Sequence, residues 1–298
     1  MKKILITGSN GLLGQSLLDL FLGDKEYQLI ALSRGENRYP IKKGYAYYAI
    51  DLTNKNQLEE IIVKESPDYI INTAAMTNVD ACEDNTEECD AINVTLVENL
   101  VELCKQTQAK LIHISTDFIF DGEQGYYKET DTPNPLSYYG NSKLRSEKVI
   151  ENIDYVILRT ILVFGKVHDM SRSNIVLWVR QMLQDKKELT IVNDQFRMPT
   201  YVKDLALACK LSVDKGVKGV FNVSSSELLS VYEIAKQIAE VFNLDGSLIS
   251  PISTATLNQK AARPSKTGFN LDKTKKQLGL PIKTFIENLK EFKLELEN

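Results

Sequence analysis

Three glycines directly after the first apolar run constrain this chain more than any other feature. The run Lys3–Thr7 is partly β-branched, Gly8, Gly11 and Gly14 follow it, and apolar residues then recur at helical spacing. Glycine lets a backbone approach a pyrophosphate held by the free N–H groups of a helix N-terminus, and a tight turn without a ligand is the alternative. The predicted dinucleotide contacts are Gly8, Ser9, Asn10, Gly11, Leu12, Leu13 and Gly14.

Strands and helices are expected to alternate through the first half of the chain. Strands are predicted at 29–33, 46–50, 69–72, 111–115 and 155–158, and helices near 56–63, 94–103 and 139–150. This alternation predicts an α/β fold with a doubly wound parallel sheet of the Rossmann type. Four further helices are expected near 174–183, 204–213, 231–242 and 281–295.

The domain prediction follows from this change of pattern. Residues 1–165 are expected to form the dinucleotide-binding domain, to which some later segments return. Residues 166–298 are expected to form mainly a small substrate-binding lobe over the C-terminal edge of the sheet, where open α/β folds bind ligands.

Composition argues against several classes of protein. The 298 residues carry a formal net charge of −4 without long basic runs, which argues against a nucleic-acid partner. No apolar stretch approaches the roughly 18 residues of a membrane span. Four cysteines without a C-x-x-C pair and two distant histidines predict a cytoplasmic protein with neither disulfides nor a metal site. The acidic residues between 80 and 90 are interpreted as a solvated surface.

The end of the second strand bears on the choice of dinucleotide. Arg34 stands where an arginine accommodates a 2′-phosphate, which favours NADPH, while Glu36 nearby keeps NADH possible. After the third strand, Asp51 and Leu52 are candidates for the adenine contact, and Asp51 is equally suited to cap the next helix.

Two later motifs predict the chemistry. Tyr139 and Lys143 are four residues apart at an expected helix start and therefore lie on one face. Ser115, Thr116 and Asp117 end a strand that the sheet would deliver beside the cofactor. A lysine ammonium about 4 Å from the Tyr139 phenolate would lower the tyrosine pKa by roughly three units, toward the working range of a proton donor.

These motifs resemble, in order and spacing, the extended short-chain dehydrogenases/reductases. Within that superfamily the chain resembles the dTDP-4-dehydrorhamnose reductase family over nearly its full length. The matching runs are 72–80, 115–122, 135–140, 159–160, 199–200 and 204–206. The resemblance implies NADPH-dependent reduction of a nucleotide-linked 4-keto-6-deoxysugar, most directly of dTDP-4-dehydrorhamnose to dTDP-rhamnose.

The resemblance also implies roles for individual residues. Tyr139 would donate the proton, Lys143 would bond the nicotinamide ribose, and Thr116 would bond the substrate oxygen. Further cofactor contacts are implied at Thr73, Ala74, Ala75 and Thr77, and further substrate contacts at Asp117, Phe118 and Arg263.

Some features leave alternatives open. Ile161 and Leu162 stand where the family commonly has Ser-Trp, which leaves the exact ketosugar open. A nucleotide-sugar epimerase or dehydratase with retained NAD is one alternative function. A non-catalytic NADP-binding regulatory subunit, resembling the β subunit of methionine adenosyltransferase, is another. A homodimer is possible, Asp204 is interpreted as a helix cap, and the two histidines are given no role.

Overall fold

A parallel sheet forms the centre of the molecule. The computed structural model describes residues 1–171, 173–257 and 259–297, and in these residues seven parallel strands pair in the order β11-β6-β5-β4-β1-β2-β3. This confirms the predicted doubly wound fold. The strands are β1 (Lys2–Thr7), β2 (Tyr27–Ser33), β3 (Tyr45–Ala49), β4 (Tyr69–Asn72), β5 (Lys110–Thr116), β6 (Tyr155–Thr160) and β11 (Gly219–Val223).

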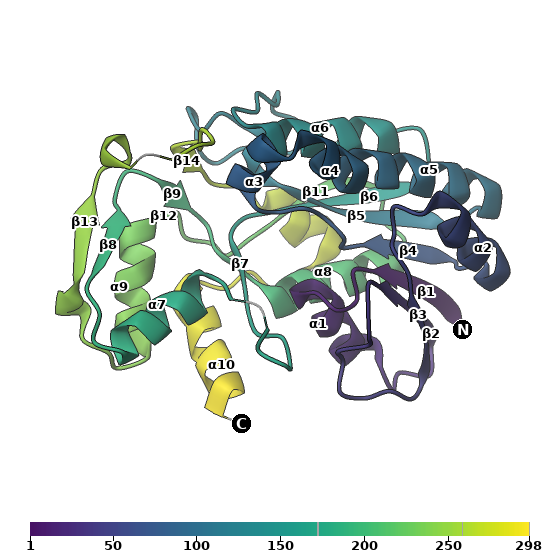
Figure 1. Cartoon of the computed structure of the whole chain (residues 1–298), viewed down its shortest axis with the longest axis horizontal. Coiled ribbons are helices and arrows are strands. Elements are labelled where there is room, and N and C mark those ends of the chain that lie inside the picture. The colour runs from purple at the N-terminus through teal and green to yellow at the C-terminus, as the bar shows by residue number, and fades with distance from the viewer. Residues whose placement is uncertain (172, 258, 298) are drawn as a thin grey trace.

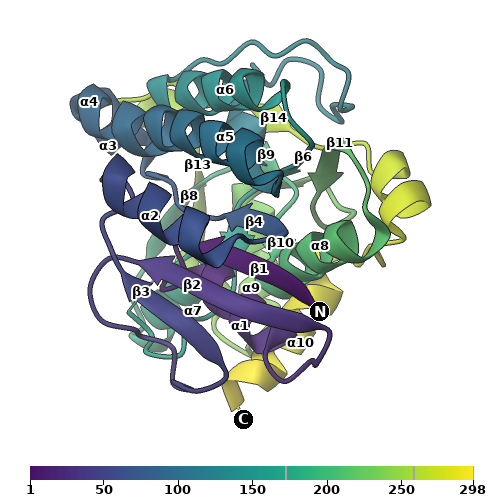
Figure 2. The same cartoon turned by 90° about the vertical axis from the view of Figure 1, so that its right-hand side faces the viewer.

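Helices cover both faces of this sheet (Figures 1 and 2). One face carries α1 (Leu12–Phe21) and α8 (Val202–Lys215), and the other carries α2 (Lys55–Glu65), α5 (Leu96–Thr107) and α6 (Tyr138–Ile150). The buried strand residues alternate between two apolar cores, so that Ile4 and Ile6 face one layer while Leu5 faces the other.

The strand order reverses between β1 and β4. The chain runs outward from β1 through β2 and β3 and then returns to place β4 on the other side of β1. Ligands of open α/β sheets bind beyond the carboxyl ends of the strands at such a reversal. The glycine loop after β1 and the segment after β4 therefore meet at the expected binding edge.

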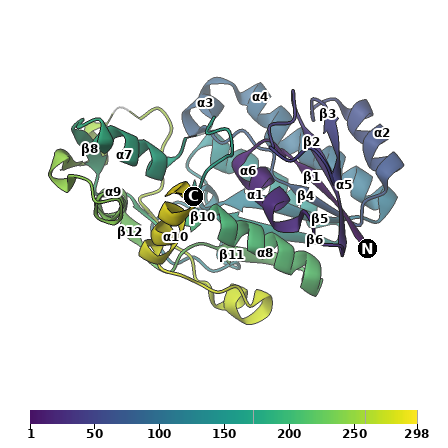
Figure 3. The ribbon, with the colours of Figure 1, turned by 90° about the horizontal axis from the view of Figure 1, so that it is seen from below.

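A smaller lobe lies beyond this edge (Figure 3). It contains α7 (Ile175–Gln184), α9 (Val231–Val241) and the paired strands β8 (Leu189–Val192) and β13 (Ile249–Ile252). The short strands β9 (Phe196–Arg197), β12 (Leu229–Ser230) and β14 (Lys266–Thr267) pair with one another nearby, and β7 (Val163–Phe164) pairs with β10 (Thr200–Tyr201). The last helix, α10 (Phe285–Glu297), packs on α9.

Segments beyond residue 166 also serve the sheet. Helix α8 packs against α1, and β11 forms an edge strand beside β6. One apolar core runs without a break from the α1 side of the sheet into the lobe, because it includes Leu17, Leu205, Ile238 and Phe292 together. Packing therefore joins the two parts of the chain. The division near residue 165 stays a proposal that the first part binds the dinucleotide and the second mainly the substrate.

The helix cap expected at Asp204 is wrong, and of the two alternatives for Asp51 the helix cap is excluded. The cap of α2 is Asn54, whose side chain accepts from Gln57 N, whereas Asp51 accepts from Thr53 one turn earlier. Asp204 lies in the first turn of α8, after the start at Val202, and pairs with Lys283. In both places the acidic residue lies near the start of a helix, but the helix begins after a different residue, Asn54 for α2 and Tyr201 for α8.

No helix in the described ranges combines the length and apolar character needed to cross a membrane.

The buried ion pair between Arg159 on β6 and Glu147 on α6 generates a stability prediction. Both side chains are 5% exposed, and Nη2 lies 2.7 Å from Oε2. Arg159→Met leaves the Glu147 carboxylate buried without its partner and should reduce the free energy of unfolding by about 3–5 kcal/mol, measured by urea denaturation. Lys55→Ala breaks an exposed pair with Glu102 and should cost no more than about 1 kcal/mol. Equal effects of the two variants would contradict this assignment.

Candidate active site

A cavity of about 1050 Å³ opens between the C-terminal edge of the sheet and the small lobe. Its wall contains most of the residues that the sequence singles out, drawn from segments far apart in the chain. Those on the wall are Gly8, Asn10, Gly11, Leu12, Leu13, Arg34, Asp51, Leu52, Thr73, Ala74, Ala75, Thr77, Thr116, Asp117, Phe118, Tyr139, Lys143 and Arg263. Of the predicted dinucleotide contacts, Ser9 and Gly14 are buried and do not line the cavity.

The glycine loop is shaped by close backbone packing. Gly8 has φ +68°, and a Cβ there would lie 2.8 Å from Thr73 Oγ1. A Cβ on Gly14 would lie 2.4 Å from the Gly8 carbonyl oxygen, so Gly14 serves packing under the loop. Gly11 caps α1 without any side-chain hydrogen bond. Leu12 and Leu13 in the first turn of α1 line the cavity and no side chain caps this helix, which suits an anion.

Asn10 joins this loop to the one after β2. Its amide nitrogen donates to the carbonyls of Arg34 and Glu36, and its Oδ1 accepts from Arg38 N at 2.9 Å. Arg34 and Arg38 both line this end of the cavity, and Asp51 lies nearby. The sequence analysis missed Arg38, although its position four residues after Arg34 in the same polar loop was a usable signal.

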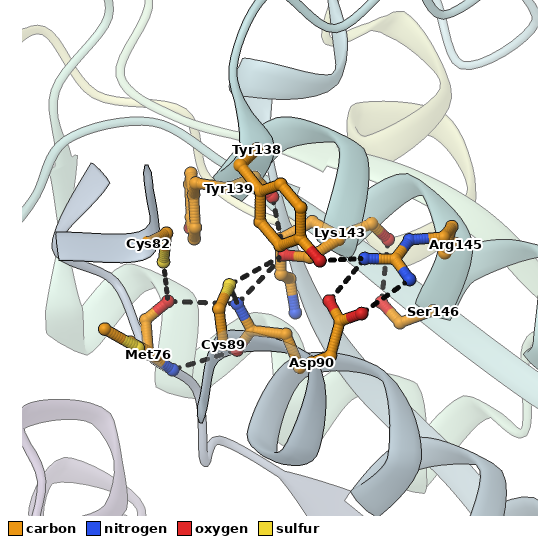
Figure 4. A network of polar contacts seen from close by, with 11 residues as sticks. Met76, Cys82, Cys89, Asp90, Tyr138, Tyr139, Lys143, Arg145 and Ser146 are labelled. Atoms are coloured by element: carbon orange, nitrogen blue, oxygen red, sulfur yellow. Dashed lines mark hydrogen bonds and ion pairs between the residues drawn. The ribbon is translucent and has the colours of Figure 1, made fainter. Parts of the chain in front are cut away.

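The side-chain amide of Asn93 binds the backbone of the segment that follows β4. Asn93 lies in the π-helical turn Ala91–Thr95 (η1), donates to Met76 O and accepts from Met76 N. It also donates to Ser142 Oγ on α6 at 3.0 Å. Figure 4 shows these contacts beside Tyr139 and Lys143. This amide thus fixes the distance between the segment at Ala74–Thr77 and the catalytic helix.

Tyr139 and Lys143 project from the first turns of α6. Ser137 caps this helix by accepting from Gly140 N, which starts the helix at Tyr138 and places both side chains on one face. Tyr139 is 8% exposed and packs edge-on against Phe118. Tyr138, in contrast, lies over Arg145, which pairs with Asp90 (Figure 4). The i, i+4 spacing therefore selects Tyr139 as the tyrosine of the cavity.

The predicted lowering of the Tyr139 pKa by Lys143 is wrong for this structure. Burial raises the pKa of Tyr139, a hydrogen bond with Thr116 opposes this, and Asp117 raises it further. The reason is the direction of the lysine: Lys143 Nζ donates to the Ile114 carbonyl at 2.8 Å and lies 2.9 Å from His113 Nε2. Burial lowers the pKa of Lys143 to about 8.

His113 is a further residue that the sequence analysis missed. It was expected to pack or face solvent without a role, yet its buried imidazole contacts Lys143, Asn72 and Ser146. A usable signal was its place two residues before Ser115 on the same expected strand. Alternate residues of a strand share a face, so His113 was expected on the same face as Ser115 of the predicted site.

A buried charge pair lies on the substrate side of Thr116. Asp117 Oδ1 accepts from Thr116 Oγ1 at 3.1 Å, and its Oδ2 accepts from Thr267. Arg197 Nε lies 3.9 Å from Oδ2, and the other guanidinium nitrogens donate to the carbonyls of Phe196, Pro264 and Ser265. Burial raises the pKa of Asp117, and Arg197 and Thr267 oppose this rise. Arg197 lies in the short strand β9, has no local motif in the sequence and was not predicted.

The far wall of the cavity comes from the lobe. Arg263 pairs with Asp80 at 2.6 Å, so part of the acidic segment forms ion pairs rather than a wholly solvated surface. Gln195 and Gln259 share a hydrogen bond on the same wall. Of the two residues that depart from the family pattern, Leu162 lines the cavity and Ile161 is buried in an apolar cluster.

Fold and site together define an oxidoreductase of the short-chain dehydrogenase/reductase class. The glycine loop at the strand reversal and the Thr116, Tyr139 and Lys143 set face one cavity, as that class requires. Residues 1–297 match the family described as RmlD substrate binding domain, and the chain belongs to this family.

Individual relatives agree with this assignment. The chain is 31% identical over 311 residues to the dTDP-4-dehydrorhamnose reductase of Aggregatibacter actinomycetemcomitans, and the match covers 100% of both. It is 32% identical to methionine adenosyltransferase 2 subunit beta of Bos taurus over 85% of this chain and 75% of that protein. A solved structure of dTDP-4-dehydrorhamnose reductase from Bacillus anthracis in complex with NADP superposes with TM-score 0.87 at 29% identity, covering 99% of this chain and 100% of that one.

The buried lysine yields a pH prediction. Because its pKa falls from 10.5 to about 8 on folding, the unfolded chain binds more protons than the folded chain between these values. Relative to Lys143→Met, the free energy of unfolding of the unmodified protein should therefore rise by about 2 kcal/mol from pH 8 to about pH 9.5. Urea denaturation across this range measures the difference. Leu144→Met removes no titratable group and should give a constant difference, and a constant difference for Lys143→Met would contradict the shift.

Proposed function

We propose that this protein reduces a nucleotide-linked 4-keto-6-deoxysugar with NADPH, and that dTDP-4-dehydrorhamnose is its substrate. One observation carries the proposal: the uncapped start of α1 and the Thr116, Tyr139 and Lys143 side chains line one cavity. The 31% identity to a dTDP-4-dehydrorhamnose reductase over the full length of both chains supports the choice of sugar.

The residues present fit a dinucleotide. Gly8 lets the loop pack closely on Thr73, and Gly8, Gly11 and the first residues of α1 line the cavity together. Arg34 and Arg38 offer two guanidinium groups for a 2′-phosphate, and Asp51 and Leu52 line the adenine end. Thr73, Ala74, Ala75 and Thr77 line the segment that leads toward Tyr139. NADPH is the proposed cofactor, and NADH remains an outcome of the test below.

When bound, NADPH supplies the hydride that reduces the ketone. In this proposal the Thr116 hydroxyl, which donates to Asp117 Oδ1 in the structure, turns to donate to the carbonyl oxygen and holds it near Tyr139. Tyr139 gives its phenolic proton to that oxygen as negative charge develops. The raised pKa keeps Tyr139 protonated before the reaction. Lys143 would hold the ribose end of the cofactor with an Nζ proton other than the one donated to Ile114 O.

The proposed substrate site lies toward the lobe. Asp117 orients the Thr116 hydroxyl, and Phe118 offers an apolar edge beside Tyr139. Arg263 is the proposed anchor for the nucleotide diphosphate, because its guanidinium lies on the lobe wall with 18% of its side chain exposed. Arg197 is engaged with three backbone carbonyls and Asp117, so its proposed role is to hold Asp117 in place.

A regulatory, non-catalytic function is the second candidate, because the chain is also similar to methionine adenosyltransferase 2 subunit beta. Such a subunit needs a dinucleotide cradle but no proton donor. The complete Thr116, Tyr139 and Lys143 set favours catalysis over binding alone.

The decisive assay follows NADPH oxidation by its near-ultraviolet absorbance with dTDP-4-dehydrorhamnose, beside other 4-keto nucleotide sugars and a blank without sugar. The proposal expects one NADPH consumed per ketosugar. An epimerase or dehydratase with retained cofactor would convert a sugar without net NADPH consumption. NADPH binding without turnover on any ketosugar would favour the regulatory alternative.

Tyr139→Phe tests the proton donor. It removes only the hydroxyl, so NADPH affinity should stay within a few-fold while kcat falls about a hundredfold or more. Tyr138→Phe is the matched control, since Tyr138 packs on Arg145 outside the cavity, and it should retain most activity. Full activity of Tyr139→Phe would reject the role.

Arg34→Ala tests the cofactor choice. Loss of one guanidinium–phosphate contact should raise the KM for NADPH about tenfold and leave the KM for NADH nearly unchanged. Arg38→Ala should act in the same direction. Arg180→Ala removes an arginine that lies over Phe242 in the lobe and should change neither constant. Equal effects of Arg34→Ala on both cofactors would reject the 2′-phosphate contact.

We also propose a cytoplasmic location and a homodimeric assembly. The four cysteines are free and buried thiols, which fits a reducing cytoplasm. A homodimer is proposed from the family resemblance, and size-exclusion chromatography with light scattering tests it.

A further inference from the structure

The imidazole of His113 is a buried titratable group that the mechanism above does not use. It lies in the middle of β5 with 1% exposure, and both ring nitrogens have polar neighbours. Nδ1 lies 3.1 Å from Asn72 Nδ2, while Nε2 lies 2.9 Å from Lys143 Nζ and 3.2 Å from Ser146 Oγ. The residue is thus in direct contact with the lysine of the active site.

The hydrogen bonds determine where the imidazole carries its proton. Thr7 Oγ1 donates to Asn72 Oδ1 at 2.6 Å, so the amide nitrogen of Asn72 points at His113. An amide nitrogen only donates, and therefore Nδ1 of His113 accepts. Burial lowers the pKa of His113 well below its usual value, so the ring is neutral and its one proton lies on Nε2.

This tautomer presents a donor to Lys143. An uncharged amine accepts the Nε2–H bond through its lone pair, whereas an ammonium group has no lone pair to accept with. When Lys143 is charged, the Nε2–H group must turn to Ser146 Oγ instead. Ser146 can accept there because its own hydroxyl proton is directed to the Lys143 carbonyl at 2.7 Å.

We propose that His113, held in one tautomer by Thr7 and Asn72, is a positioning residue that sets how readily Lys143 takes up a proton. Asn72 and Thr7 disfavour the charged lysine through His113, and Ser146 favours it by accepting the displaced Nε2–H bond. The chain Thr7–Asn72–His113–Lys143 links the end of β1 to the catalytic helix through side chains alone.

Other groups near Lys143 act on its charge independently of His113. Glu147 on the same helix favours the ammonium, but its carboxylate is bound by Arg159 of β6. Cys89 on α4 (Thr86–Asp90) favours it as well, and Tyr139 lies one turn away on α6. Asp117, next to Tyr139, is paired with Arg197. Replacements at Ser146 and Asn72 leave all of these groups in place.

Ser146→Ala gives the sharpest kinetic test, which rests on the proposed function. It removes the acceptor that the Nε2–H group needs when Lys143 is charged, so Lys143 should lose its proton at lower pH. The basic limb of the kcat/KM profile for the ketosugar should move down by roughly half a pH unit or more. Ser212→Ala is the matched control: this buried serine of α8 donates to the carbonyl of Ala208 in the same way and lies outside the His113 network. It should leave the limb in place.

A spectroscopic test is independent of activity. Nitrogen-15 NMR of the imidazole, in protein carrying His168→Asn so that one histidine remains, should show neutral His113 with its proton on Nε2. Asn72→Asp offers Nδ1 only a hydrogen-bond acceptor, so the imidazole proton should move to Nδ1. Nε2 can then accept from the Lys143 ammonium, and the basic limb of the kcat/KM profile should move to higher pH. Ser146→Thr keeps the hydroxyl that Ser146→Ala removes, so its basic limb should lie at the pH of the unmodified protein.

A proton on Nδ1 in the unmodified protein would overturn the proposal, whether or not the protein is a reductase. Equal basic limbs for Ser146→Ala and Ser212→Ala in an active enzyme would also overturn it. Absence of ketosugar turnover in the unmodified protein, with the Nε2 tautomer intact, would instead reject the proposed function.

Discussion

The close approach of the β1 and β4 segments is the constraint on which the rest of the structure depends. Gly8 leaves so little space against Thr73 and Ala74 that no side chain fits there, and Gly14 packs as tightly beneath the Gly8 carbonyl. This contact aims the N-terminus of α1 at the cavity. It also places Asn72, one residue before Thr73, at the end of β4. Asn72 is paired with His113 of the neighbouring strand β5 and bonds its ring, so the contact positions His113 as well.

Around that contact the protein buries several charged groups and gives each a partner. Arg159 holds Glu147, Arg197 holds Asp117, and Lys143 is held by a carbonyl and an imidazole. Uncompensated charges in such an interior would be costly, so these pairs fix the geometry around the reacting centre. They keep the Thr116 hydroxyl and the Tyr139 phenol on one wall of the cavity, which is what proton donation to a ketone requires.

The sequence predicted the features that arise from local patterns. The parallel alternation, the glycine loop and the i, i+4 pair of Tyr139 and Lys143 are each encoded within a few residues. What it missed depends on tertiary contacts: His113 acquires its role through a neighbouring strand and a helix, and Arg197 through a loop of the lobe. The direction of the Lys143 amine was wrong for the same reason, because spacing along a helix does not reveal which carbonyl or ring the amine meets.

The central claim is that a hydride passes from NADPH to the keto carbon of a nucleotide sugar in this cavity. Mass spectrometry of the product formed with NADPH deuterated on the transferred side of the nicotinamide tests it most directly. Direct hydride transfer predicts one deuterium per sugar, bound at C4. Tyr139→Phe should form only the small amount of this product that its residual turnover allows. A converted sugar without deuterium would contradict the account and indicate chemistry that recycles a retained cofactor.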